Sequence, residues 1–415
     1  MGKMKSLKIA LVLFGSVACP LITPVWAQVD GVEGGGVVPG VEVLQQRGFD
    51  LLRGKRVGLV TNQTGRDRAG VATIDILRRA LGVKLVALYA PEHGIRGQVT
   101  AGAGVKNGRD AVSGLPVYSL YGATRQPTAA MLKGVQTLVF DMQDVGSRSY
   151  TFLATLEKCR LACAAHGVSL VVLDRPNPLG RGVEGNVPQK FSFVCPFPLP
   201  YRYGLTIGEV ARWLNGRASK KCQLSVVPLQ NYQGQTFGYS GLSWTRSSPN
   251  IPRANSAFFY AATGIIGELP TVSVGIGTPW PFEVVGAPGV DAHALAARLN
   301  ARRLAGWNFR AASWTPSKGA YARKLCQGVY IELADERVAQ GTRLNFEIFA
   351  ALRQVAPKIS FFGSSSRNTM FDAVCGTSEI RRLMQHGQSA DSVWNVWNRG
   401  AAAFKQQSRK FWLYG

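Results

Sequence analysis

The sequence lacks the features that define several common classes of protein. After the first 27 residues, no apolar run approaches the ~20 residues that a membrane-spanning helix needs. None of the seven cysteines forms a C-x-x-C pair, so a structural zinc site is not expected. The glycine-rich motifs of dinucleotide-binding and P-loop proteins are absent, as is the G-x-S-x-G motif of α/β-hydrolases. Their absence argues against nucleotide cofactors and against that serine nucleophile.

The first 27 residues have the order of a secretory signal peptide. Lys3, Lys5 and Lys8 precede the apolar run 9–17, and a small-residue cleavage signal at 25–27 precedes Gln28. This order predicts export to the periplasm or secretion. A lipoprotein site at Cys19 is the less favoured alternative. Six cysteines would remain after cleavage, and an even number in an oxidising compartment permits disulfides whose pairing the sequence leaves open.

Acidic residues are scarce. The chain has 24 of them against 48 lysines and arginines; three of the basic residues lie in the signal segment, which leaves a net charge of +21 after cleavage. Such a protein should be attracted to acidic polymers, which outside the cytoplasm include cell-wall glycans. No nucleic-acid motif or compact basic helix is present, so nucleic acid is not the expected partner. The sequence gives no indication of the oligomeric state.

The pattern of apolar residues predicts a Rossmann-like domain at residues 46–254, after a flexible lead-in at 28–45. Short apolar runs alternate with helical segments, as in a parallel sheet covered on both faces. The expected strands are 57–60, 84–89, 137–140, 168–173 and 224–227, and the expected helices are 72–81, 150–166 and 207–215. The fold class is therefore α/β, with a doubly wound parallel sheet.

Residues 255–415 have a different pattern and predict a smaller α+β domain. Expected strands are 271–275, 307–314 and 328–333, and expected helices are 291–304, 343–355 and 392–406.

Polar clusters follow four of the predicted strands of the first domain, at 61–65, 91–96, 141–148 and 174–178. In open parallel sheets, ligands bind at the carboxyl ends of the strands. Carboxylates, amides and guanidinium groups together suit a sugar that carries a negative charge. We expect catalytic residues among Glu92, Asp141 and Asp144, and substrate-binding residues among Asn62, Gln63, His93, Arg96, Gln143, Arg148, Tyr150, Arg175, Asn177, Glu184 and Asn250.

Glu92 is the strongest candidate for proton transfer because it follows a buried strand. The alternative is a salt bridge with Arg96. One of Asp141 and Asp144 could be catalytic while the other caps a helix. His93 could orient Glu92, bind substrate or have a structural role.

Three further segments have both a structural and a functional interpretation. Thr206 and Glu209 fit a helix-capping box, which favours a structural role for Glu209. The rigid loop 248–252 could line the crevice. Trp280 and Phe282 could offer a stacking face to a sugar, although core packing is an equal alternative.

The motifs, in this order, resemble the exo-β-N-acetylmuramidase (NamZ) family. The resemblance rests on T-N-Q-T-G at 61–65, P-E-H-G-I-R-G at 91–97, F-D-M-Q-D-V-G-S-R-S-Y-T at 140–151 and D-R-P-N-P-L-G at 174–180. It continues through V-E-G at 183–185, Y-G-L-T-I-G-E at 203–209, S-P-N-I-P at 248–252 and P-F-E-V-V-G-A-P at 281–288. It implies release of N-acetylmuramic acid from the non-reducing end of peptidoglycan fragments and a candidate acid/base role for Glu92. No cofactor or metal is expected.

The chain departs from the family pattern at three places. Thr271 occupies the place of an asparagine and Ile276 the place of an arginine, and the basic residues that usually follow Asn231 and Tyr232 are absent. Loss of an arginine can remove a bidentate contact with a carboxylate. A non-catalytic or altered-specificity glycan-binding protein is therefore an alternative to the hydrolase. A second alternative is a metal-dependent hydrolase that uses Glu92, His93, Asp141 and Asp144, because these side chains are plausible ligands for a hard cation.

Overall fold

The computed structural model describes residues 35–100, 102–363 and 365–415. The predicted signal peptide, the possible lipidation site at Cys19 and the first part of the lead-in lie outside the described residues. Among the described helices, none combines the length and the apolar composition needed to cross a bilayer.

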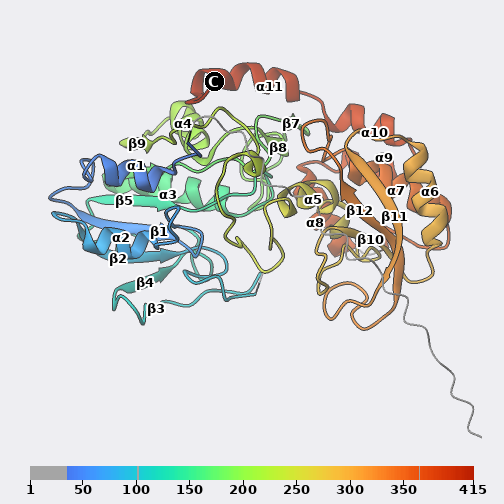
Figure 1. Ribbon diagram of the computed structural model, residues 1–415, viewed down its shortest axis with the longest axis horizontal. Helices are drawn as coiled ribbons and strands as arrows, with labels where there is room; N and C mark the ends of the chain where they lie inside the picture. Colours follow the sequence, from blue (N-terminus) through green and yellow to red (C-terminus); the bar gives the residue numbers. More distant parts are fainter. Residues whose placement is uncertain (1–34, 101, 364) are drawn as a thin grey trace, which may run out of the picture. The chain divides into compact units, whose positions relative to one another are not determined.

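The predicted parallel sheet is confirmed (Figure 1). Seven strands lie in the order β3-β4-β2-β1-β5-β6-β9, and all neighbours are parallel except β3 and β4. The order of the six parallel strands reverses direction between β1 and β5, which is the switch point of a Rossmann-like fold. The strands are β1 (Arg56–Thr61), β2 (Lys84–Ala90), β3 (Gly108–Arg109), β4 (Pro116–Ser119), β5 (Thr137–Asp141), β6 (Ser169–Leu173) and β9 (Leu224–Val227).

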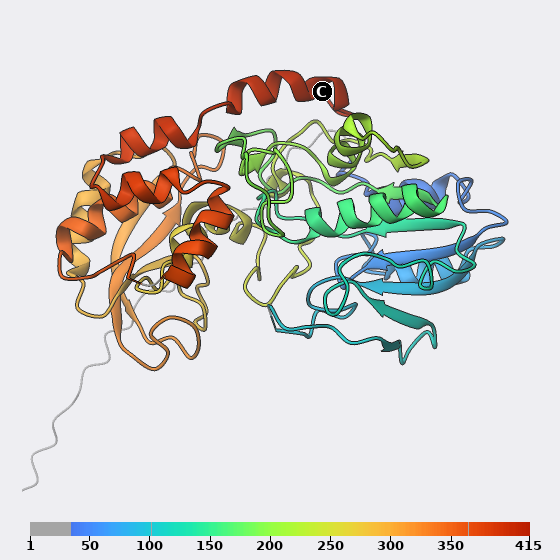
Figure 2. The same ribbon diagram turned by 180° about the vertical axis from the view of Figure 1, so that it is seen from behind.

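Helices cover both faces of this sheet, as its continuous apolar strands require. Helices α1 (Gly40–Gln46) and α2 (Thr73–Arg79) share one apolar core with β1 and β2. Helices α3 (Phe152–His166) and α4 (Ile207–Arg217) belong to the core on the other face, and α3 lies in front of the sheet in Figure 2.

The prediction of a flexible lead-in up to residue 45 is wrong from residue 37 onward. Val38 forms a β-bridge with Gln230, and Val41 and Leu44 of α1 are fully buried against the sheet. Burial of these apolar side chains stabilises an ordered segment, although its glycine-rich composition suggested a flexible one.

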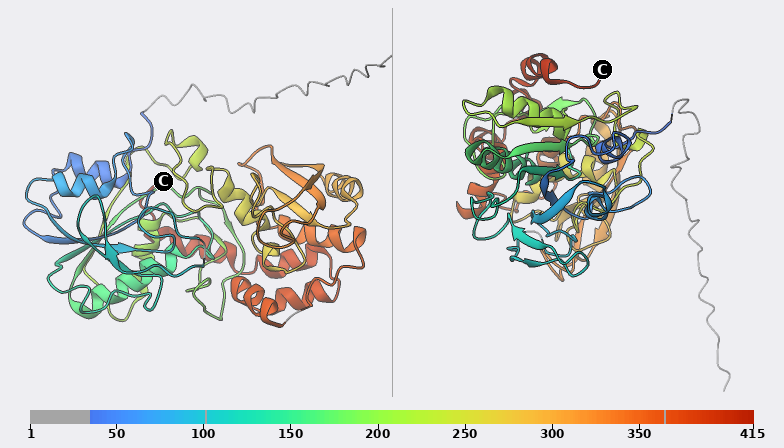
Figure 3. Two further views of the ribbon diagram at one scale, coloured as in Figure 1. Left: turned by 90° about the horizontal axis from the view of Figure 1, so that it is seen from below. Right: turned by 90° about the vertical axis from the view of Figure 1, so that its left-hand side faces the viewer.

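The smaller α+β region is also confirmed. Its antiparallel sheet has the order β10-β12-β11, and the C-terminal helices gather along one side of this region in Figure 3. Its elements are α5 (Ser256–Thr263), β10 (Val284–Ala287), α6 (Ala292–Ala301), β11 (Trp307–Trp314), β12 (Cys326–Leu333), α7 (Leu344–Val355), α8 (Ser365–Cys375), α9 (Glu379–Gln385), α10 (Ala390–Trp397) and α11 (Ala401–Ser408). The exact boundary at residue 255 stays a prediction.

Two predicted elements of this region differ from the structure. Residues 271–275 form only a bridge between Ser273 and Gly286, because Gly275 and Gly277 adopt positive φ angles that end an extended segment. The single helix expected at 392–406 is two helices separated by a turn at Gly400, whose φ is 87°. The remaining short elements are β7 (Val183–Glu184), β8 (Arg202–Tyr203), η1 (Phe237–Tyr239), η2 (Ile266–Glu268) and η3 (Arg409–Phe411).

The residues after α11 return to the first domain. The η3 segment contacts α4, and Leu413 N donates to Glu209 Oε1 at 2.8 Å. The Tyr414 hydroxyl donates to Asp174 Oδ2 at 2.6 Å and accepts from Leu229 N at 2.8 Å. The last residues of the predicted second domain therefore complete the packing of the first.

Candidate active site

The polar clusters after the strands lie at the same edge of the sheet. Thr61 at the end of β1 is paired in register with Asp141 at the end of β5, and Val60 with Phe140. Since the strands are parallel, the segments that follow them leave the sheet side by side. The structure then sorts the predicted residues into three groups: those around Glu92, those around a neighbouring pocket, and those that bind other parts of the protein.

Glu92 is held by hydrogen-bond donors. Its side chain is buried, with 9% of the residue exposed. Gly102 N donates to Oε1 at 2.8 Å, and the Thr151 hydroxyl donates to Oε2 at 2.7 Å. The Tyr121 side chain also lies beside Glu92, and its pKa is raised to about 12 by burial and by the charge of Glu92. Arg96 binds Asp110 at 2.8 Å, so the alternative of a Glu92–Arg96 salt bridge is wrong.

Tyr150 lies within electrostatic range of two of the predicted catalytic carboxylates. Its hydroxyl donates to Ser247 Oγ at 3.1 Å, and its ring packs edge-on against Tyr260 at 6.1 Å. Burial raises the pKa of Tyr150, and the charges of Asp144 and Glu92 raise it further. Tyr150 therefore connects the Glu92 region with Asp144 and with the loop at 247–252.

Asp144 is a buried carboxyl with a free oxygen. Its Oδ1 accepts from the Tyr203 hydroxyl and from Gly146 N at 2.8 Å. Its Oδ2 has no hydrogen-bond partner among the described residues. Burial raises the pKa of Asp144 to about 6, against the lowering effect of its hydrogen bonds. A carboxyl of this kind can exchange a proton near neutral pH.

Asp141, the third predicted catalytic residue, has both oxygens occupied. Arg175 donates to Oδ1 at 2.5 Å and to Oδ2 at 2.9 Å, and the Thr73 hydroxyl donates to Oδ2 at 2.5 Å. A fully buried ion pair with this geometry fixes the loops after β5 and β6. Asp141 and Arg175 therefore hold the edge of the sheet in place, and Asp141 has no free oxygen for catalysis.

Two amides after β1 keep unused polar groups. Asn62 accepts from Thr64 through Oδ1, but its Nδ2 is buried without a partner among the described residues. Gln63 donates from Nε2 to the carbonyls of Arg246 and Ser247, while its Oε1 is likewise unpartnered within the described chain. Unsatisfied buried groups are costly, and they are frequently retained where a ligand completes them.

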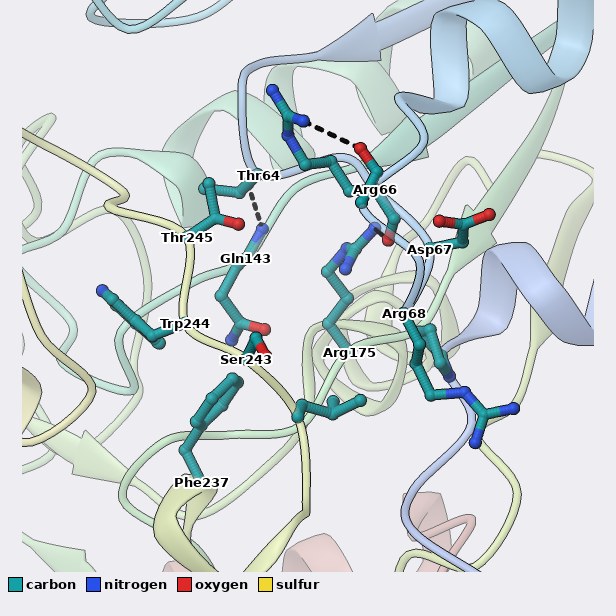
Figure 4. A pocket seen from close by; sticks show the side chains of 13 residues that line it. Thr64, Arg66, Asp67, Arg68, Gln143, Arg175, Phe237, Ser243, Trp244 and Thr245 are labelled. Atoms are coloured by element: carbon teal, nitrogen blue, oxygen red, sulfur yellow. Dashed lines mark hydrogen bonds between the residues drawn. The ribbon is translucent and has the colours of Figure 1, made fainter. Parts of the chain in front are cut away.

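A polar pocket lies beside this region (Figure 4). Figure 4 shows Gln143, Arg175 and Arg66 around it, with Phe237 of η1 and Trp244 of the loop that follows η1. Gln143 is fixed by its Nε2, which donates to the carbonyls of Asp144 and Pro176 at 2.8 Å. Glu92 is not among the residues that line this pocket. The prediction of a single crevice shared by all the polar clusters stays a prediction.

Arg148 and Glu184, predicted to bind substrate, instead connect the two domains. Arg148 is fully buried and donates to the carbonyls of Asn186, Leu199, Val374 and Cys375. Glu184 binds Arg202 at 2.8 Å and accepts from Thr342 N and Oγ1 at 2.8 Å. Because a buried charge requires compensating partners, these two side chains form hydrogen bonds and an ion pair within the protein.

Three other predicted binding residues also make internal contacts. Asn177 donates to Leu205 O and accepts from Leu179 N. His93 Nδ1 lies 2.8 Å from Val99 O, which supports the structural alternative for this side chain. Asn250 is partly buried, and its backbone N donates to Ser248 Oγ. The capping box of Thr206 and Glu209 is confirmed.

The departures from the family pattern at Thr271 and Ile276 lie in the second domain. Ile276 packs near Gly319 in the loop after β11, and the carbonyl of Thr271 accepts from the Tyr321 hydroxyl at 3.4 Å. That these departures alter substrate preference or activity stays a prediction.

Sequence reasoning missed four residues that shape the site. Thr151 ends the long motif at 140–151, and Ser247 directly precedes the motif at 248–252, so both had a local signal. Tyr203 begins the motif at 203–209. Tyr121 lies in the connection after β4 and had no signal, because only the folded chain brings it to Glu92.

The geometry gives no support to the metal-dependent alternative. Among residues 35–415, omitting 101 and 364, no three histidine, cysteine or acidic side chains come together as a metal-ligand set. The carboxylate of Asp141 binds Arg175, and that of Glu92 binds Thr151 and Gly102.

The fold and the site define a Rossmann-like α/β protein with buried carboxylates at the carboxyl edge of its sheet and a second α+β region. Models of the N-terminal and C-terminal domains of exo-β-N-acetylmuramidase NamZ match residues 57–255 and 258–414. The chain belongs to the NamZ family.

Relatives support this assignment. The peptidoglycan β-N-acetylmuramidase NamZ of Bacillus subtilis (strain 168) is 36% identical over 382 residues, which cover 91% of each chain. A crystal structure of a DUF1343 family protein from Bacteroides fragilis is similar with a TM-score of 0.87 and 41% identity, covering 91% of this chain and 99% of that one. A second DUF1343 structure from the same organism has a TM-score of 0.73 and 30% identity, covering 92% and 99%.

Proposed function

We propose that this protein is an exo-acting glycoside hydrolase that releases N-acetylmuramic acid from the non-reducing end of peptidoglycan fragments. The observation that carries the proposal is the setting of Glu92. In a chain of the NamZ family, it is a buried carboxylate bound by a backbone N–H and a hydroxyl, with no cationic partner among the described ion pairs.

Glu92 would serve as the acid/base. Cleavage of a glycosidic bond requires a proton for the leaving oxygen, and a positioned carboxyl group supplies it. Thr151 and Gly102 fix the two oxygens of Glu92, so its carboxyl group has a defined orientation. Tyr121 lies beside this carboxyl group, whose charge contributes to the raised pKa of Tyr121.

Asp144 is the better candidate for the second carboxylate, in place of Asp141. Its Oδ2 is free within the described chain, and its pKa of about 6 lets both protonation states exist near neutral pH. A retaining enzyme needs its two carboxyls about 5–5.5 Å apart, and an inverting enzyme about 6.5–9.5 Å. The acetamido group of the substrate is the alternative partner for Glu92.

Product analysis with defined peptidoglycan fragments tests this function. The wild-type protein should release free N-acetylmuramic acid from fragments that carry it at the non-reducing end, and Glu92→Gln should abolish the release. Glu379→Gln is the matched control because Glu379 is a partly exposed carboxylate in a distant helix. Full activity of Glu92→Gln would refute its role, and binding without any product would favour the glycan-binding alternative.

We also propose that the chain is exported, on the basis of the signal pattern in its first 27 residues. The intact mass of the protein recovered from an expressing bacterium tests this. Cleavage before Gln28 would support a signal peptide, whereas a mass that includes acyl chains on Cys19 would show lipidation.

A further inference from the structure

The small sheet β10-β12-β11 leaves a hollow on the face opposite α6. Trp307 and Phe309 of β11 and Ile331 of β12 belong to the core that includes α6. Because side chains alternate along a strand, Arg310 and Tyr330 point to the other face, where they are paired in register. Ala312 and Gly328 form the next pair on that face, and their small size leaves space beside Tyr330. The hollow is lined by these strands and by Trp280.

Trp280 is an exposed aromatic residue at this hollow. It is 41% exposed, and its indole N–H makes no hydrogen bond to the described residues. The centroid of its ring lies 6.4 Å from that of Tyr330, with the planes at 81°, and the Arg310 guanidinium lies 5.3 Å from the Tyr330 ring. The exposed face of an aromatic ring gains free energy when a ligand covers it, and its polar edge can still meet water.

This arrangement separates Trp280 from Phe282, which the sequence grouped as one stacking face. Phe282 is buried and packs edge-on against Tyr260 at 5.1 Å. Its positive φ of 69° turns the chain between the two rings. Core packing is thus the role of Phe282, while Trp280 remains open to a ligand.

Basic residues of the loop after β11 form the rim on one side of the hollow. Arg310, within the hollow, is ion-paired with Glu332 at 2.6 Å. Lys318, Arg323 and Lys324 are exposed in the loop after β11. This loop is held beside Trp280, because Ser317 N and Oγ both donate to Gly277 O, at 3.0 and 2.8 Å. Such a rim favours a ligand with carboxylates.

The hollow is connected to the Glu92 site by direct contacts. The Tyr330 hydroxyl donates to Glu283 Oε2 at 3.0 Å, and Glu283 pairs with Arg253 just after the loop at 248–252. In parallel, Phe282 contacts Tyr260, which contacts Tyr150, and Tyr150 directly precedes the Thr151 that binds Glu92. These side-chain contacts place the hollow on elements that adjoin the Glu92 region.

We propose that this hollow is a subsite for the part of the glycan that remains after the terminal sugar is removed. Its occupant is an N-acetylated β-linked glycan with carboxylates, whose sugar ring stacks on Trp280 while its carboxylates face the basic rim. This proposal rests on the proposed function, because Glu92 defines which end of the glycan is cleaved. It gives the second domain a direct role in substrate recognition.

Kinetics on two substrates of different length test the proposal. Trp280→Ala should raise KM for a peptidoglycan oligosaccharide roughly three- to tenfold, as expected for the loss of one aromatic stacking contact. The variant should leave kcat for this substrate, and both constants for a short chromogenic β-muramide, unchanged. Trp280→Phe should restore most of the affinity. Equal KM values for wild type and Trp280→Ala on the oligosaccharide would overturn the proposal.

Phe191→Ala is the matched control, because Phe191 is an exposed aromatic residue of the first domain. Arg310→Gln provides a second variant on the same face, since Arg310 is exposed and its loss leaves the core intact. Circular dichroism and thermal unfolding should show that all variants fold.

Binding to insoluble peptidoglycan separates this proposal from the proposed function. If the wild type releases no product from any substrate, hydrolysis is refuted, but Trp280→Ala should still bind the polymer more weakly than wild type and Phe191→Ala. Equal retention of Trp280→Ala and wild type would refute the subsite whether or not the protein is active.

Discussion

The hydroxyl of Thr151 donates a hydrogen bond to Oε2 of Glu92 at 2.7 Å, although the two residues are 59 positions apart in the sequence. Thr151 immediately precedes α3, so a helix on one face of the large sheet orients the carboxyl group that follows β2. This hydrogen bond makes the orientation of Glu92 depend on a rigid element.

Replacement of Thr151 by valine should impair catalysis without unfolding the protein. A hydrogen bond to a charged group contributes about 1.5–3 kcal/mol, so kcat should fall roughly 10- to 100-fold. The rate on a chromogenic β-muramide measures the effect. Thr155→Val is the control, because Thr155 lies one turn later in α3 and donates only to Thr151 O at 3.2 Å. Equal losses in both variants would indicate a general effect on the helix.

Asp144 should make stability depend on pH. Burial raises its pKa from 3.8 to about 6, so the folded state binds this proton more tightly than the unfolded chain does. The resulting contribution to the free energy of unfolding is fully present below pH 3.8 and is lost as the pH rises through about 6. At about 1.4 kcal/mol per pKa unit, the change is on the order of 2–3 kcal/mol.

Asp144→Asn removes this titration while Oδ1 can still accept from Tyr203 and Gly146. Urea unfolding at pH 4.5 and pH 7.5 should show that the variant gains stability relative to wild type at the higher pH. If the free energies of unfolding of the variant and the wild type differ by the same amount at both pH values, the raised pKa of Asp144 is contradicted. The same variant tests catalysis, because a second catalytic carboxyl cannot be replaced by an amide without loss of activity.

Arg148→Met should be strongly destabilising. The guanidinium group satisfies four buried carbonyls, two of them at residues 374 and 375, and also Asn186 Oδ1. Loss of these donors leaves buried acceptors without partners, which costs about 3–5 kcal/mol in total. The free energy of unfolding in urea measures this loss. Arg399→Met, at an exposed arginine, should change stability by less than about 0.5 kcal/mol.

Tyr414→Phe should reduce stability by about 1–2 kcal/mol, because the hydroxyl both donates to Asp174 and accepts from Leu229 N inside the first domain. The ring would remain in contact with Tyr232, so the apolar packing is preserved. Tyr239→Phe is the control, because Tyr239 is exposed. Thermal unfolding that is equal for both variants would refute this role of the Tyr414 hydroxyl.

The parallel sheet could be predicted because its strands are buried on both faces and read as continuous apolar runs. Strands β3 and β4 could not be predicted, because they lie within the long connection between β2 and β5 and are only two and four residues long. The strand predicted at 271–275 is absent although Val272 and Val274 are buried as strand residues often are. Their burial comes from the core of the second domain, and only Ser273 pairs with a strand.

The location of the site was predictable, but the role of each polar residue was not. A motif shows that Asp141, Arg175 and Asp144 lie at one edge of the sheet. It does not show that Arg175, 34 residues later, occupies both oxygens of Asp141, or that Asp144 keeps one oxygen free. Such pairings depend on contacts between loops that are distant in sequence, so only the folded chain decides which charges are left for a substrate.

The return of residues 411–414 to the first domain has a consequence for biosynthesis. A chain that emerges from the ribosome N-terminus first presents Asp174 and Glu209 more than 200 residues before their partners Tyr414 and Leu413. The first domain can therefore form its sheet early but cannot complete this buried network until residues 413 and 414 have been made. The half of the molecule that contains Glu92 would reach its final stability only after the half that we assign to glycan recognition has been made.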